Sequence, residues 1–162
     1  MKNAGSAIVL LTLCFGCTAF PPEITERFGP GQDSEEFSDA LHAVVEPGTE
    51  AISVLASWYP ETYGYEDMGV PALDHPAGVL VVTETDVIFF GWNDMEYAPK
   101  KTIPRLDLTV VVTEAIGKSR RLVLGSENDL NTFELVREDR MYVDSEGTEV
   151  IAALLSNDPD VQ

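Results

Sequence analysis

The stretch that decides the fold is Gly78–Trp92, which reads GVLVVTETDVIFFGW. It contains two runs of β-branched and aromatic residues, Gly78–Thr83 and Val87–Trp92, separated by the polar residues Glu84-Thr85-Asp86. Such runs favour strands, and a short polar break between them is typical of a β-hairpin. We therefore predict two adjacent antiparallel strands in this stretch.

Further strand patterns lie on both sides of this hairpin. Ala51–Trp58 precedes it, and a long loop from Tyr59 to Ala77 joins the two. After it, Gly117-Lys118 and Glu138-Asp139 are predicted to be the turns of two more hairpins. The strands predicted around these turns are Thr102–Thr113, which Pro104 breaks early, Ser119–Leu124, Asn131–Val136 and Arg140–Val143.

Helices are predicted at both ends of this β region. Asp33 and Glu36 form a D-x-x-E pattern, which resembles a capping box at a helix start. The last helix is predicted to begin at a cap on Asp144 or Ser145. The apolar positions expected to face the core at helical spacing are Phe37, Leu41, Val44 and Val45 in the first helix, and Val150, Ile151, Leu154 and Leu155 in the last. The predicted fold class is α+β, mainly β.

Charge and motif content narrow the range of functions. The chain has 28 Asp and Glu against 10 Lys and Arg, a net charge of -18. Such a surface repels phosphate backbones, so we expect no nucleic-acid partner. The sequence holds no G-x-S-x-G, P-loop, H-E-x-x-H or glycine-rich dinucleotide motif. We therefore expect a protein that is not an enzyme and that uses no cofactor or metal.

The N-terminal residues have the proportions of a secretory signal. Lys2 is followed by the uncharged run Ala4–Gly16, which is shorter than the about 20 residues that span a bilayer. Both cysteines of the chain, Cys14 and Cys17, lie at its end in the sequence LCFGCT.

A small residue, Gly16, directly precedes Cys17, and this arrangement resembles the lipobox of bacterial lipoproteins. The resemblance implies that residues 1–16 are removed as a signal peptide and that Cys17 carries the lipid. Cys14 departs from the pattern, because the family usually has Leu at that place. A plain signal peptide or an uncleaved segment is the alternative.

The rest of the chain is then divided into three parts. Residues 17–32 are rich in Pro and Gly and are predicted to be a flexible tether. Residues 33–157 form the folded domain, and 158–162 form a tail. Lipidation would place the protein on the bacterial cell envelope, and we expect the outer membrane, facing the periplasm.

The order of seven strands followed by one amphipathic helix resembles the pleckstrin-homology (PH) superfold, especially its GRAM and bacterial PH-like branches. The resemblance covers roughly residues 41–156 and includes the Gly78–Phe90 hairpin, Val45–Glu50 (VEPGTE), and Ile103-Pro104 followed by Asp107-Leu108. It implies a seven-stranded antiparallel barrel or sandwich, capped by the C-terminal helix, that binds rather than catalyses.

The Tyr59–Ala77 loop is the first candidate site. Phosphoinositide-binding PH domains hold phosphates with Lys and Arg in the corresponding loop, whereas this one has four acidic residues and no basic one. We therefore expect no phosphoinositide ligand. The loop carries residue types that are enriched at protein interfaces, namely Tyr59, Tyr63, Tyr65 and Met68. These side chains could instead cover the mouth of the barrel.

The second candidate site is basic. Six of the ten basic residues are Lys100, Lys101, Arg105, Lys118, Arg120 and Arg121. Those around the predicted Gly117-Lys118 turn, Lys118, Arg120 and Arg121, could dock an acidic protein or head group, or could be solvated strand ends. Together these features predict a membrane-anchored envelope lipoprotein whose PH-like domain binds or scaffolds an unknown envelope protein. The alternative is a small-ligand carrier or an envelope enzyme that uses the 59–77 loop.

Overall fold

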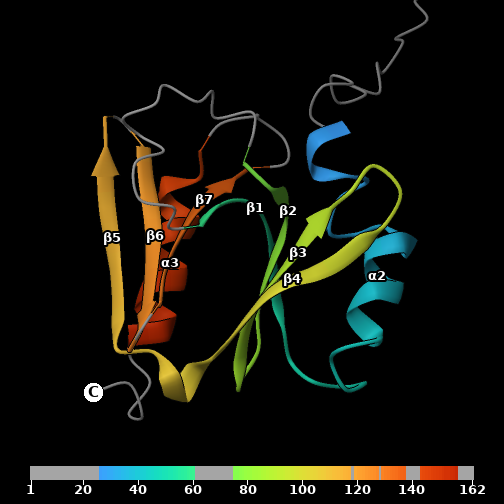
Figure 1. Ribbon diagram of the computed structural model, residues 1–162, viewed down its shortest axis with the longest axis horizontal. Helices are drawn as coiled ribbons and strands as arrows, with labels where there is room; N and C mark the ends of the chain where they lie inside the picture. The colour runs from blue at the N-terminus through green and yellow to red at the C-terminus, as the bar shows by residue number, and fades with distance from the viewer. Residues whose placement is uncertain (1–25, 61–74, 118, 128, 138–142, 157–162) are drawn as a thin grey trace, which may run out of the picture.

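The computed structural model describes residues 26–60, 75–117, 119–127, 129–137 and 143–156. In them, seven antiparallel strands form one sheet in the order β4-β3-β2-β1-β7-β6-β5, with the helices α2 and α3 beside it (Figure 1). The elements are α2 (Glu35–His42), β1 (Ile52–Pro60), β2 (Ala77–Val82), β3 (Asp86–Trp92), β4 (Tyr97–Pro104), the short 3-10 helix η3 (Arg105–Asp107), β5 (Val110–Ile116), β6 (Ser119–Ser126), β7 (Asp129–Val136) and α3 (Ser145–Ser156). The prediction of a mainly β fold with seven antiparallel strands, an N-terminal helix and a C-terminal helix is confirmed.

The predicted hairpin is formed by β2 and β3, which pair from Gly78–Gly91 to Val82–Val87. Both strands are buried on both faces, because successive side chains enter two different cores. Leu80 and Phe89 lie in the first core, and their neighbours enter the second. This double burial is why the hairpin reads as two continuous apolar runs rather than as an alternation.

The two cores use different elements. The first core draws on six strands and on α3, and its largest buried side chains are Leu80, Phe89, Leu122, Leu124, Phe133, Leu135 and Leu155. The second lies under α2, where Phe37 meets Phe90 and Tyr97 edge-on, at ring-centroid distances of 5.6 and 5.3 Å. The sheet is thus covered by α2 on one face and curls around the first core on the other.

Contacts across the first core show how strongly the sheet curls. The rings of Phe89 in β3 and Phe133 in β7 are 5.9 Å apart, although three strand spacings of about 4.8 Å would separate these strands in a flat sheet. Lys101 of β4 also forms an ion pair with Asp129 of β7. The sheet nevertheless stays open, because β4 and β5 each have only one strand neighbour. The structure therefore does not have the hydrogen-bonded closed barrel of the prediction.

One predicted strand, Thr102–Thr113, is wrong, because the chain leaves the sheet at Pro104. Proline has no N–H with which to continue a strand ladder, and η3 follows it directly. The two halves of the segment belong to β4 and β5, which lie at opposite edges of the sheet. The early part of β4, which contains Pro99 and Lys100, was missed because these residues favour strands weakly.

The last predicted hairpin, around Glu138-Asp139, lies largely outside the described residues. The Gly117 turn between β5 and β6 is confirmed, with Gly117 at φ 61°. β7 begins at Asp129, which pairs with Ser126 at the end of β6. Of the predicted strand Arg140–Val143, residues 140–142 lie outside the described residues, and Val143 makes an isolated bridge to Val136. The structure has seven strands because the predicted strand Thr102–Thr113 is divided between β4 and β5.

The caps and faces of the helices differ in detail from the prediction. The N-cap of α2 is Ser34 rather than Asp33, since its Oγ accepts a hydrogen bond from the Phe37 N–H at 3.1 Å. In α3 the buried face is Thr148, Ile151, Ala152 and Leu155, whereas Val150 and Leu154 are 59% and 39% exposed. Thr148 can be buried because its hydroxyl donates to the Asp144 carbonyl at 2.7 Å.

The folded part includes residues from the end of the predicted tether. Phe28 is buried in the second core. The Tyr97 hydroxyl donates to the Phe28 carbonyl at 2.7 Å and accepts from the Gly31 N–H at 2.8 Å. In the described part of the chain, none of the helices is long and apolar enough for a membrane crossing.

Candidate functional site

The structure joins two residues that the sequence assigns to separate sites. The guanidinium of Arg121, on β6, lies 4.0 Å from the centroid of the Tyr59 ring, on β1. The strand between them is β7, and its Glu134 interacts with both. One residue of the predicted aromatic site and one of the predicted basic site therefore form a single cluster on the sheet.

Glu134 organises this cluster. Its Oε2 accepts from Arg121 Nε at 3.2 Å, and its Oε1 accepts from the Tyr59 hydroxyl at 3.5 Å. The side chains of Arg121 and Glu134 are only 14% and 18% exposed. The His75 ring packs on Tyr59 at a centroid distance of 4.1 Å. A cation–π contact of this kind in a partly desolvated place stabilises the pair by about 1–2 kcal/mol.

The tyrosine stays protonated at neutral pH. Burial raises the pKa of Tyr59 above its ordinary value, and the carboxylate of Glu134 raises it further. The positive charges of Arg121 and Arg27 oppose this rise without cancelling it. Tyr59 therefore keeps its proton and donates it to Glu134 in a hydrogen bond.

The other predicted residues are placed elsewhere. Tyr63, Tyr65, Met68 and Lys118 lie outside the described residues. Arg120 forms an ion pair with Glu149 of α3 at 2.7 Å, so it points to the face of the sheet opposite to Arg121, as adjacent strand residues do. Both arginines and Lys101 thus have acidic partners within the domain. Their charge is offset locally.

Three residues in or beside this cluster, Glu134, His75 and Ser57, were not predicted from the sequence. Glu134 lies in an ordinary alternating strand, and only the pairing of Glu134 with Ser57 places it beside Tyr59. His75 follows Asp74 directly in the sequence, and this neighbour alone does not identify a functional site. Ser57 is fully buried, and its hydroxyl has no hydrogen-bond partner among the described residues. The available signal was weak, because none of these positions forms a motif.

A second surface is a mainly apolar groove of about 520 Å³. It lies between the beginning of β1, the end of β7 and the beginning of α3, with Ile52, Val54, Leu135, Val150 and Ile151 among its lining residues. Ile52 is 42% exposed.

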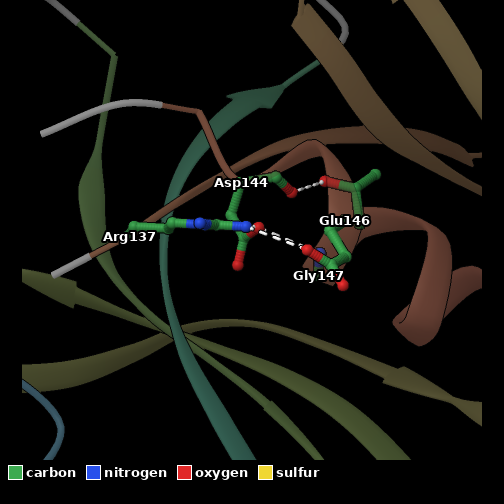
Figure 2. Close-up of polar contacts among 5 residues, drawn as sticks. Arg137, Asp144, Glu146 and Gly147 are labelled. Atoms are coloured by element: carbon green, nitrogen blue, oxygen red, sulfur yellow. Dashed lines mark hydrogen bonds and ion pairs between the residues drawn. The ribbon is translucent and has the colours of Figure 1, made fainter. Parts of the chain in front are cut away.

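The rim of this groove is an ion-pair network (Figure 2). Arg137 Nε donates to Asp144 Oδ1 at 3.0 Å, and its Nη2 donates to Glu146 Oε2 at 3.2 Å. The same Asp144 oxygen accepts from the Gly147 N–H at 3.0 Å and so caps α3. Burial alone would raise the pKa of Asp144, but these hydrogen bonds and the charge of Arg137 lower it overall.

Replacing Asp144 with alanine is expected to lower the free energy of unfolding by about 1–2 kcal/mol at pH 7, because α3 loses its cap and Arg137 loses its ion pair with Asp144. A pKa lowered by folding contributes stability above the unfolded pKa of about 3.9, and this contribution is lost as pH falls through the folded pKa. Denaturant unfolding of both proteins should therefore converge at acidic pH. The matched control is Ser145→Ala, which should stay close to wild type; a difference that is equal at all pH values contradicts the assignment.

Neither a metal site among the residues described nor a known relative identifies the function of these surfaces. Within the described ranges, no three His, Cys, Asp or Glu side chains gather where they could hold a metal ion. No protein-family model matches the chain, and no curated protein is significantly similar to it. The class of protein is thus defined by its architecture, an open curled antiparallel sheet with a helix on each side.

Proposed function

We propose that this protein is a lipid-anchored lipoprotein of the bacterial cell envelope, held on the outer membrane through Cys17, with a PH-like domain that binds another envelope protein without catalysis. The signal-like residues 1–16 and the Gly16-Cys17 junction support the anchor. The strand order, the strong curl of the sheet and the C-terminal helix support the PH-like identity. More than one acyl chain is needed for stable membrane attachment.

The Tyr59–Arg121 contact carries the binding part of the proposal. Tyrosine and arginine are the residue types, with tryptophan, that most often dominate the binding energy of protein interfaces. Glu134 holds both in place, so little side-chain entropy is left to lose on binding. Tyr63, Tyr65 and Met68 follow Tyr59 closely in the sequence and are of residue types enriched at protein interfaces.

The anchor is tested by labelling cells that produce the protein with a radioactive fatty acid. Cys17→Ser is expected to remove the label from the protein and to release it from the membrane fraction, because the acylated thiol is gone. Cys14→Ser is the matched control and should be labelled like wild type, since Cys14 belongs to the discarded signal. Undiminished labelling of Cys17→Ser would show that the anchor is assigned wrongly.

The binding surface is tested by crosslinking the protein in its own membranes and measuring recovery of the crosslinked partner. Arg121→Ala is expected to weaken binding by about 2 kcal/mol, which is the usual loss at an interface hot spot. Arg120→Ala is the control, because Arg120 lies on the opposite face and pairs with Glu149. Thermal unfolding must show that both variants are folded. Equal recovery from the two variants contradicts a binding role for the cluster.

The alternative is a small-ligand carrier or an envelope enzyme that uses the 59–77 loop. One observation favours a carrier, namely the apolar groove of about 520 Å³. Among the described residues, its lining comes mainly from β1, β7 and α3. Binding of an apolar fluorescent probe distinguishes this alternative from the protein-binding module. A carrier is expected to bind the probe in the groove, and Val150→Trp, which places a larger side chain in the groove lining, is expected to reduce that binding.

A further inference from the structure

The two edges of the sheet differ in how they are protected. The β4 edge carries the devices that prevent strands from pairing with other chains. Pro99 and Pro104 have no N–H to donate, the register shifts between Phe89 and Phe90, and the residue left over by this shift is Lys100. Lys101 of the same strand is engaged by Asp129. Another strand would find few backbone partners along β4.

The β5 edge has none of these devices. Its residues, VVVTEAI, include no Pro, Gly, Lys or Arg, and they pair with β6 without a register shift from Val110–Gly125 to Ile116–Ser119. Every second residue of such an edge points its N–H and C=O away from the sheet. Figure 1 shows β5 as the outermost strand, and β6 is its only strand neighbour among the described residues. Val110 and Val112 are 39% and 49% exposed.

We propose that β5 pairs antiparallel with β5 of a second copy of this chain and so continues the sheet across a twofold axis. This goes beyond the proposed function and does not depend on the lipid anchor or on the Tyr59–Arg121 cluster. A symmetric pair needs a strand that is complementary to itself, and the sequence of β5 meets that condition in one register.

The register that pairs all of β5 is centred on Thr113, which then faces Thr113 of the second copy. Val110 lies opposite Ile116, and Val111 lies opposite Ala115, so apolar side chains meet on both faces. Glu114 lies opposite Val112 rather than opposite the other Glu114. Like charges directly opposite one another destabilise a strand pair, and this register avoids them.

Charge also favours this edge as the meeting surface. The chain carries a net charge of -18, which holds copies apart. Within β5 the single charged residue is Glu114, and the arginines of β6 behind it are offset by Glu149 and Glu134. The edge is thus close to neutral, and the remaining repulsion is long-range. Added salt screens such repulsion, so the dimer should tighten as the salt concentration rises.

The first test is sedimentation equilibrium of the full chain carrying Cys14→Ser and Cys17→Ser, at low and high salt. We expect a monomer–dimer equilibrium that salt strengthens. Adding Val112→Lys should weaken dimerisation at least about tenfold, because it places a charge beside the pairing strand. Met95→Lys adds the same charge at an 85% exposed position far from β5 and should leave the equilibrium unchanged. A monomer at all concentrations, or a dimer unaffected by Val112→Lys, overturns the proposal.

The second test reads the register and does not depend on affinity. In the same background, Thr113→Cys should form an intermolecular disulfide on mild oxidation, because opposite residues in antiparallel strands have Cα atoms about 4.5–5.5 Å apart. Glu114→Cys should not, because its two copies lie on a diagonal of about 7–8 Å. Equal crosslinking of the two variants, or none of Thr113→Cys, overturns the pairing even if the protein dimerises. A dimer that weakens with salt would indicate an ionic interface instead.

Discussion

Replacing Phe89 with alanine is expected to lower the free energy of unfolding by about 3–5 kcal/mol, the usual loss for a large buried aromatic side chain. Phe89 is fully buried in the first core, where its ring lies 5.7 Å from that of Trp58 and 5.9 Å from that of Phe133. These contacts join β3 to β1 and β7. The substitution would therefore leave a cavity between strands that the curl of the sheet brings together. A small domain has only about 5–15 kcal/mol of stability to lose.

Guanidinium unfolding followed by circular dichroism measures this loss. Met95→Ala is the control, because Met95 is 85% exposed and its truncation should change stability by less than about 0.5 kcal/mol. Phe89→Leu, which fills part of the cavity, should fall between the two. A loss below about 1 kcal/mol for Phe89→Ala would mean that Phe89 does not lie in the main core.

Gly78→Ala is expected to destabilise the protein by about 3 kcal/mol, at the upper end of the usual cost of overpacking. A Cβ added at Gly78 would lie 2.0 Å from the carbonyl oxygen of Phe90 in the neighbouring strand. That atom belongs to the backbone, so it cannot rotate away, and β2 and β3 must separate locally. The damage reaches both cores, because these two strands are buried on both faces.

The matched control is Gly91→Ala, on the residue that pairs with Gly78. There the added Cβ meets the Lys100 side chain at 2.8 Å, and this exposed, flexible chain can move aside. We expect a cost of less than about 1 kcal/mol in the same denaturation experiment. If both glycines tolerate alanine equally, β2 and β3 do not approach as closely as the structure has them.

The elements with strong local signals were predicted correctly. The β2–β3 hairpin consists of two apolar runs on either side of a polar break. The β5–β6 turn is indicated by Gly117, because glycine adopts a positive φ freely. The prediction failed where a local signal was ambiguous. Ser34 and Asp33 are both good caps, and only the backbone position of Ser34 lets its hydroxyl reach the Phe37 N–H.

The candidate site was predicted only in parts. Tyr59 and Arg121 were each identified, but the sequence held no sign that they meet, because 62 positions separate them along the chain. The pairing of β1 with β7 and of β7 with β6 brings them together, and strand pairing between distant segments has no local signature. Glu134, which holds both, could be recognised only after that pairing was known.

By itself, the sequence determined the class of the fold, the central hairpin, the two terminal helices and the acidic surface, because each depends on residues that are neighbours in the chain. The tertiary structure alone decided that β4 and β5 are the two edges, that the sheet curls without closing, and that Tyr59, Arg121 and Glu134 form one cluster. The physical reason is burial. Which side chains leave water together depends on how the whole sheet folds around its cores, and no short stretch of sequence contains that information.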